Sequence, residues 1–225
     1  MTSGYDLRPM PESGDAAMLA RLAAVATSTL GHFRLWGLCD PAIAPVVPCG
    51  RVAGVAVTLA LPGADGALLH HALGQLRAGD ILAIDRLGDD RHACVGGVVA
   101  RAAKARGITA IVVDGPVTDT DELAAIDLPI WARGKSALTT RRLGLGGRFN
   151  APVSVGGAVI QPGDMLLCDG DGVVCLNADE CAPALRRAAE LADQESGILS
   201  GLSRGATLES LLPSAPIEPV LGVQS

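Results

Sequence analysis

The sequence predicts an α/β fold in which helices and strands alternate around a mixed sheet. Short apolar runs rich in β-branched residues recur along the chain, and segments with apolar residues at helical spacing separate them. Residues 96–106 and 108–113 predict a helix followed by a strand that is buried on both faces, which completes a central β-α-β unit. Because strands and helices with an apolar side must bury it against one another, we expect a layered domain.

The elements expected in the first half follow from local patterns. Residues 1–13 carry no periodicity and predict a loose arm. Apolar residues at helical spacing predict a helix over 15–30, with Asp15 as its N-cap. Gly107 is expected to end the helix over 96–106. The other elements expected here are a strand at 51–61, a helix at 67–76 and a strand at 81–85.

The second half continues the alternation. We expect a helical turn at 120–125, a strand at 128–132 and a flexible stretch at 143–150. Strands are expected at 152–160, 165–168 and 173–176, before a long amphipathic helix at 182–199. The tail from Pro213 onward is rich in proline and small residues and is expected to be mobile. We therefore predict a single domain over 1–225 with its core at about 15–212.

Composition narrows the classes of function. The chain has 225 residues, of which 49% are hydrophobic and 19% charged, so it has the means to bury a core. Only 2% of the residues are aromatic and the net charge is −6, which argues against a nucleic-acid surface built on base stacking and cationic side chains. Gly and Pro interrupt the apolar runs, so no membrane span is expected.

The cysteines and the N-terminus bear on the compartment. Six cysteines are scattered without CxxC spacing, most of them among apolar residues, which favours reduced, buried thiols over a metal centre or disulfides. The first residues show no basic segment followed by an apolar stretch, so no signal peptide is expected. These observations predict a cytoplasmic protein.

Charged residues concentrate in one loop of this apolar chain, over 85–92 (DRLGDDRH). The loop joins the end of a predicted strand to the start of a predicted helix, where ligands of open α/β sheets bind. Arg86, Arg91 and His92 are therefore candidate site residues. The alternative is an exposed loop with local ion pairs.

Two further segments are candidates for the same site. Gly96 and Gly97 open a predicted helix, where backbone N–H groups and the helix dipole favour an anion, although two glycines before a helix are common. Asp114 and Asp119 follow the buried strand and could hold a hard divalent cation, partly through water. The alternative for Asp119 is a helix cap at Thr120.

The residues also carry the pattern of a known family. The runs GDILAID, VGGVVARAAKARGITAIVVDGPVTDTDEL, LPIWARG and NAPVSVGGAVIQPGDMLLCDGDGVVCL stand in this order between Arg51 and Leu212. This pattern resembles the RraA-like family, which includes the ribonuclease E activity regulator and the 4-hydroxy-4-methyl-2-oxoglutarate aldolases. The resemblance implies a swivelling β/β/α-type layered domain, assembled as a homotrimer or hexamer with active sites at subunit interfaces.

The resemblance also implies a chemistry. Aldolases of this family cleave 4-hydroxy-2-oxo acids to pyruvate and a second oxo acid, and many decarboxylate oxaloacetate. A divalent metal, usually Mg²⁺ with Mn²⁺ as the alternative, polarises the 2-oxo group and stabilises the enolate. The implied substrate is a small anionic carboxylate.

Positions are carried over from the family residue by residue. The matches are Asp119 with the metal-side aspartate of an Arg-Asp pair, His70 with a histidine near the pyruvate site, the amides of Gly96, Gly97 and Val98 with the loop that cradles the substrate carboxylate, and Glu195 with an acid from a neighbouring subunit. Two positions depart from the family pattern. Thr118 stands where the pair has Arg, and Gly97 stands where the helix start has an acid.

Three functions remain open at this stage. The first is a metal-dependent carbon–carbon lyase, an aldolase or decarboxylase, acting on a 2-oxo acid. The second is another enzyme, an isomerase or hydrolase, that uses the retained carboxylate site. The third is a non-catalytic binding trimer of the ribonuclease-regulator type. In the enzyme hypotheses Arg86 or Arg91 compensates for Thr118, because a hydroxyl cannot grip a carboxylate bidentately.

Overall fold

The computed structural model describes residues 4–212, which divide into two compact units over 4–185 and 186–212. The strands are β1 (Tyr5–Leu7), β2 (Ala44–Pro45), β3 (Val52–Ala60), β4 (Asp80–Asp85), β5 (Ala110–Val117), β6 (Ile130–Lys135), β7 (Gly147–Phe149), β8 (Val153–Val155), β9 (Ala158–Ile160), β10 (Met165–Asp169) and β11 (Gly172–Leu176). The helices are α1 (Ala16–Ala23), α2 (Thr27–Gly31), α3 (Ala67–Gln75), α4 (Gly97–Ala105), α5 (Thr120–Ile126), α6 (Ala178–Ser203) and α7 (Leu208–Leu211).

A mixed sheet forms the centre of the first unit. Strands β3, β4, β5 and β6 pair in parallel in that order, while β10 and β7 both pair antiparallel with β3. Outside them, β1 runs parallel to β7, β2 antiparallel to β6, and β11 antiparallel to β10. Strands β8 and β9 form a separate hairpin.

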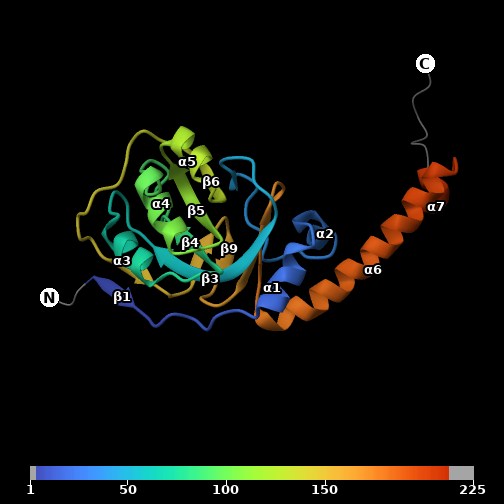
Figure 1. Cartoon of the computed structure of the whole chain (residues 1–225), viewed down its shortest axis with the longest axis horizontal. Helices are drawn as coiled ribbons and strands as arrows, with labels where there is room; N and C mark the ends of the chain where they lie inside the picture. Colours follow the sequence, from blue (N-terminus) through green and yellow to red (C-terminus); the bar gives the residue numbers. More distant parts are fainter. Residues whose placement is uncertain (1–3, 213–225) are drawn as a thin grey trace, which may run out of the picture. The chain divides into compact units, whose positions relative to one another are not determined.

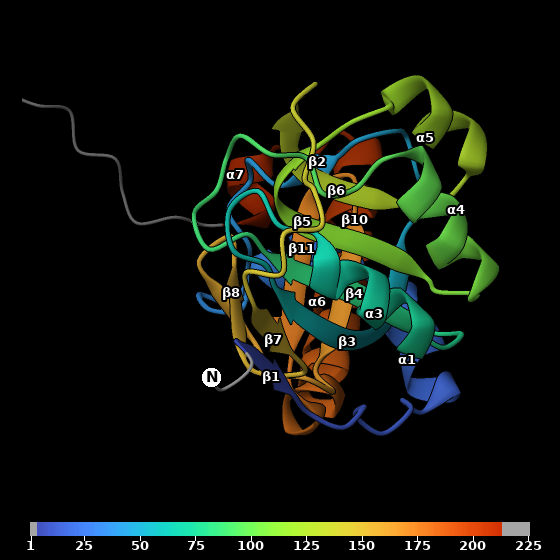
Figure 2. The same ribbon diagram turned by 90° about the vertical axis from the view of Figure 1, so that its left-hand side faces the viewer.

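The two faces of the parallel strands are covered differently. Val57 and Leu59 of β3 belong to a core shared with α3, α4 and α5, which lie together over that face (Figures 1 and 2). Ala56 and Ala60 point to the opposite face and join a second core with residues of β8–β11. Successive strand residues point to opposite faces, so strands buried on both sides contribute to both cores. The result is a β/β/α arrangement, and the predicted layered α/β fold with a mixed sheet is confirmed.

Most predicted elements occur close to their expected positions. Asp15 caps α1, since its Oδ1 accepts a hydrogen bond from the Ala17 amide at 2.9 Å, and Gly107 adopts φ +74° just after α4. The helix expected over 15–30 is divided into α1 and α2. The strand expected over 152–160 is the β8–β9 hairpin, because Gly156 and Gly157 both adopt positive φ and reverse the chain.

Two predictions about mobile segments need correction. Residues 1–13 were expected to form a loose arm and 143–150 a flexible stretch, yet Tyr5–Leu7 pairs with Gly147–Phe149 as β1 and β7. Each segment is short and lacks periodicity, so only the pairing with its distant partner makes it a strand. The tail from Pro213 lies outside the described residues.

The second unit contains the C-terminal part of α6 and the whole of α7. Gly201 is close to Leu211, since a Cβ at position 201 would lie 2.7 Å from a Leu211 methyl carbon. Thr207 caps α7 through a hydrogen bond from the Ser210 amide at 3.3 Å. Across residues 4–212, no helix combines the length and the hydropathy that a membrane crossing needs.

Candidate functional site

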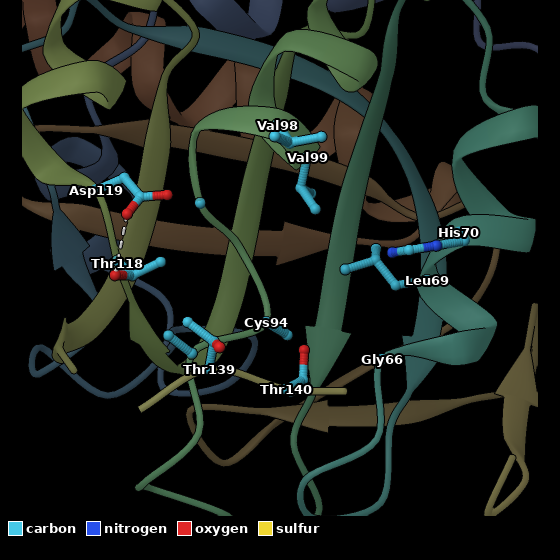
Figure 3. Close-up of a pocket in the computed structure, with 12 residues that line it drawn as sticks. Gly66, Leu69, His70, Cys94, Val98, Val99, Thr118, Asp119, Thr139 and Thr140 are labelled. Atoms are coloured by element: carbon cyan, nitrogen blue, oxygen red, sulfur yellow. Dashed lines mark hydrogen bonds between the residues drawn. The ribbon is translucent and has the colours of Figure 1, made fainter. Parts of the chain in front are cut away.

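A cavity of about 190 Å³ opens where the chain leaves the parallel strands of the sheet. It lies between α3, the start of α4, the loop from β5 to α5 and the segment that follows β6 (Figure 3). The carboxyl ends of parallel strands are the usual position of ligand sites in open α/β sheets. The lining residues are Gly66, Leu69, His70, Ala93, Cys94, Gly96, Val98, Val99, Thr118, Asp119, Thr139 and Thr140.

Backbone pairing brings four chain segments around this cavity. Val95 bridges Val117 at the end of β5, so the start of α4 lies beside Thr118. Ala93 bridges Thr139, and Asp65 bridges Arg141, which draws the segment after β6 across the loop before α3. The cavity walls therefore come from segments that are far apart in the sequence.

Asp119 is the N-cap residue of α5, but its side chain is directed at α4. It adopts φ +55°, and its side chain makes no capping hydrogen bond to α5. Its Oδ2 instead accepts a hydrogen bond from the Gly97 amide at 3.0 Å, while the Thr118 hydroxyl donates to Oδ1 at 3.3 Å. The carboxylate thus lies at the positive end of α4, where a helix favours an anion. The alternative prediction was that Asp119 caps the helix at Thr120. Asp119 is the N-cap residue of α5, which begins at Thr120, but its side chain does not make the capping hydrogen bond.

The two glycines at the start of α4 leave room for acidic side chains. A Cβ at Gly96 would lie 2.5 Å from Asp119 Oδ2 and 2.7 Å from the Thr118 methyl carbon. A Cβ at Gly97 would overlap the carboxylate of Glu122, a residue of α5. Asp119 and Glu122 can therefore approach the α4 backbone this closely only because positions 96 and 97 carry no side chain.

The remaining walls carry few polar groups. His70 is exposed on α3 and faces the cavity from the wall opposite Asp119 (Figure 3). Thr139 and Thr140 contribute hydroxyl groups from the segment after β6. Burial raises the pKa of the Cys94 thiol to about 11, although the nearby charge of Arg86 lowers it. Cys94 therefore stays protonated at neutral pH and is a poor nucleophile.

The charged loop over 85–92 lies beside the cavity without lining it. Arg86 is fully buried and donates from Nη2 to the Gly63 carbonyl and to Asp89 Oδ2. The Asp89 carboxylate also accepts hydrogen bonds from the Arg91 amide and the His92 ring, and these outweigh burial and lower its pKa. The Arg91 side chain is exposed. The loop is thus a local ion-pair cluster, and Arg86 lies close to Cys94.

The structure brings together only part of the predicted site. Among the predicted residues, those that line the cavity are His70, Gly96, Val98, Thr118 and Asp119. Gly97 donates its amide hydrogen bond to Asp119. Arg86 and His92 pair with Asp89 in the neighbouring loop, whereas Arg91 contacts Asp89 only through its backbone amide. Glu195 is an exposed residue of α6 in the second unit.

Sequence reasoning missed several residues around the site. Cys94 lies in the loop before α4 but was grouped with inert buried thiols. Thr139 and Thr140 follow β6 in a segment with no recognisable motif. Glu122 was missed because its proximity to Gly97 arises from the packing of α5 against α4. Its position in the first turn of the helix that follows Asp119 was the available signal.

The structure thus combines a β/β/α fold with a cavity in which an acidic residue, Asp119, faces the start of a helix. Residues 26–175 match the model of the RraA-like family, described as Aldolase/RraA, and the chain belongs to that family.

Two relatives carry the same name, "Putative 4-hydroxy-4-methyl-2-oxoglutarate aldolase". The protein from Halalkalibacterium halodurans is 33% identical over 146 residues, which cover 65% of this chain and 69% of the relative. The protein from Burkholderia mallei is 38% identical over 135 residues, which cover 60% of this chain and 81% of the relative.

A solved structure from Streptomyces coelicolor has a similar fold. It is described as an unusual member of the RNase ES inhibitor RraA protein family. The two structures agree with a TM-score of 0.74 at 25% sequence identity, over 87% of this chain and 100% of that one. The family thus includes proteins named as aldolases and proteins described as ribonuclease inhibitors.

Proposed function

We propose that this chain is a divalent-metal-dependent carbon–carbon lyase, an aldolase or decarboxylase, that acts on a small 2-oxo acid. The observation that carries this proposal is the carboxylate of Asp119 at the rim of the cavity, turned toward the start of α4. The names of the aldolase relatives support the same reaction class. A cavity of about 190 Å³ suits a substrate of a few carbon atoms.

The residues at this position fit Mg²⁺ or Mn²⁺. Both ions prefer carboxylate oxygens, and Mg²⁺ keeps several water molecules and needs only one or two protein carboxylates. Among residues 4–212, no group of three or more His, Cys, Asp or Glu side chains forms a complete ligand cage. Asp119 would therefore hold the ion together with water and substrate oxygens. The bound cation would polarise the substrate carbonyl and so lower the cost of the charge that develops on cleavage.

The chain's own groups bind and orient the substrate. The amides of Val98 and Val99 belong to the first turn of α4, where N–H groups have no partner within the helix, and both residues line the cavity. We propose that these amides receive the substrate carboxylate. The Thr118 hydroxyl can donate one hydrogen bond, whereas an arginine would donate two and carry a charge. His70, on the opposite wall, is available for proton transfer.

Asp119 is tested by replacement with asparagine. Mg²⁺ or Mn²⁺ should raise the melting temperature of the wild type and stimulate oxaloacetate decarboxylation, because an ion that binds only the folded state stabilises it. Asp119→Asn should lose the thermal shift and reduce metal-dependent turnover on the order of 10²–10³-fold, since metal stabilisation is worth several kcal/mol. Asp121→Asn, at an exposed position two residues later in α5, is the control. Equal shifts in wild type and Asp119→Asn would contradict the metal role.

We also propose that the chain assembles as a homotrimer or hexamer. Leu35, Trp36 and Val159 are 94%, 60% and 67% exposed and line a cavity of about 460 Å³ in the first unit. Exposed apolar groups of this size are typical of surfaces that become buried on association. Light scattering at micromolar concentration should give three or six times the mass of one chain. A monomeric mass would refute this assembly.

A non-catalytic regulator is the second candidate function. Thr118 favours it, because an arginine at this position would be suited to stabilise negative charge in a lyase. The likeness to the Streptomyces coelicolor protein is consistent with it. An oligomeric wild type that binds no Mn²⁺ and turns over no 2-oxo acid would favour this function over the lyase.

A further inference from the structure

Glu122 occupies the space of a side chain that Gly97 lacks. A Cβ built at position 97 would overlap Glu122 Oε2, and it would lie 3.0 Å from Glu122 Cδ and 3.4 Å from its Cβ. The whole Glu122 side chain thus lies over the first residue of α4. An acidic residue at 97 and a glutamate in this conformation at 122 exclude each other.

The local structure directs Glu122 toward α4. Glu122 lies in the first turn of α5, which begins directly after Asp119 and packs against α4. Arg101, four residues after Gly97 on α4, approaches Glu122 with an Nη2–Oε2 distance of 3.6 Å. Both side chains are largely exposed, so this contact places the carboxylate beside the α4 start without fixing it there.

Two carboxylates therefore converge on the Gly96–Gly97 backbone from one short segment. Asp119 reaches the Gly97 amide, while Glu122 covers the Cβ side of the same residue. Two carboxylates close to the same backbone segment repel each other unless a cation or a proton neutralises them. The Glu122 side chain is 59% exposed, so its oxygens can move toward an ion at little cost in desolvation.

We propose that Glu122 supplies, from α5, the carboxylate that the family pattern has at position 97, and that Asp119 and Glu122 together hold the divalent cation. This inference rests on the proposed function and adds a second acidic residue to its metal site. In the loaded protein Glu122 exchanges its contact with Arg101 for the ion or for one of the ion's water molecules.

The test measures Mn²⁺ binding directly, by calorimetry and by the loss of the free-ion electron paramagnetic resonance signal. Glu122→Gln keeps the size of the side chain and removes its charge, and should weaken Mn²⁺ binding by about 10–100-fold, as loss of a metal-supporting carboxylate does. Asp121→Asn removes the same charge from the neighbouring exposed position and should leave the affinity within about threefold, since an exposed charge is largely screened. Melting temperatures without metal check that each variant is folded.

An exchange of positions separates a ligand from a merely structural residue. Glu122→Ala should lose Mn²⁺ affinity, and Gly97→Asp added to it should restore the affinity, because the carboxylate returns from the other helix. Gly97→Asp alone should lower the melting temperature, because the new side chain collides with Glu122.

The outcomes distinguish this inference from the proposed function. If the wild type binds no Mn²⁺, both are overturned. If Asp119→Asn abolishes Mn²⁺ binding while Glu122→Gln binds as the wild type does, the metal site stands and the role of Glu122 is refuted. Failure of Gly97→Asp to restore affinity in folded Glu122→Ala would also refute it.

Discussion

Restoring the arginine of the Arg-Asp pair should increase metal-dependent oxaloacetate decarboxylation by about 10²–10³-fold, the usual value of one preorganised donor to developing negative charge. Thr118 lines the cavity directly before Asp119, so the arginine of Thr118→Arg would enter the same space. A guanidinium there can bind a carboxylate bidentately, which a threonine hydroxyl cannot do. The gain should appear in kcat more than in KM, because the charge develops in the transition state.

The acid at position 97 should be restored only together with a change at 122. Gly97→Asp in the wild-type background would collide with Glu122, so the complete family pattern requires Thr118→Arg, Gly97→Asp and Glu122→Ala in one chain. Thr139→Arg is the matched control, because it adds the same charge to the cavity from the segment after β6. A Thr118→Arg protein that folds and binds Mn²⁺ but decarboxylates no faster than the control would contradict this role for the arginine.

The fold was predictable wherever local pattern and burial agree. Strands β3 and β5 are mostly apolar because both of their faces are covered. Helix α4 shows an apolar stripe and ends just before Gly107. Strands β1 and β7 were not predictable, since three-residue segments have no periodicity. Their strand conformation comes from pairing with each other and from the pairing of β7 with β3.

The site was predictable where it follows a strand directly. Asp119 and Gly96 both lie just beyond strands or at a helix start, and these positions meet at one edge of a parallel sheet. The role of the charged loop could not be read from composition. Arg86 pairs with Asp89 within the loop, and only the structure shows that this pairing leaves Arg91 in solvent. Glu122 required knowledge of how α5 packs on α4.

Arg86 should be the charged residue whose loss most destabilises the first unit. Its side chain is fully buried and donates hydrogen bonds to the Gly63 carbonyl and the Asp89 carboxylate. It also lies close to the Cys94 thiol. Removing one partner of a buried ion pair leaves the other charge poorly compensated, so Arg86→Met should lower the free energy of unfolding by about 3–5 kcal/mol. Urea denaturation measures the change. Arg91→Met, at an exposed position in the same loop, should change it by less than about 0.5 kcal/mol.

A double-mutant cycle and a pH series show whether the Arg86–Asp89 pair is responsible. Asp89→Asn combined with Arg86→Met should cost less than the sum of the single changes, because the second substitution removes the charge that the first left unpaired. Hydrogen bonds hold the pKa of Asp89 below its ordinary value of 3.8, so its ionised form contributes stability at pH values above 3.8. As the pH falls through the lower native pKa, that contribution is lost, and the difference between wild type and Asp89→Asn should shrink. Additive costs, or an Arg86→Met protein within about 1 kcal/mol of wild type, would show that Arg86 fills buried space without stabilising the unit through its charge.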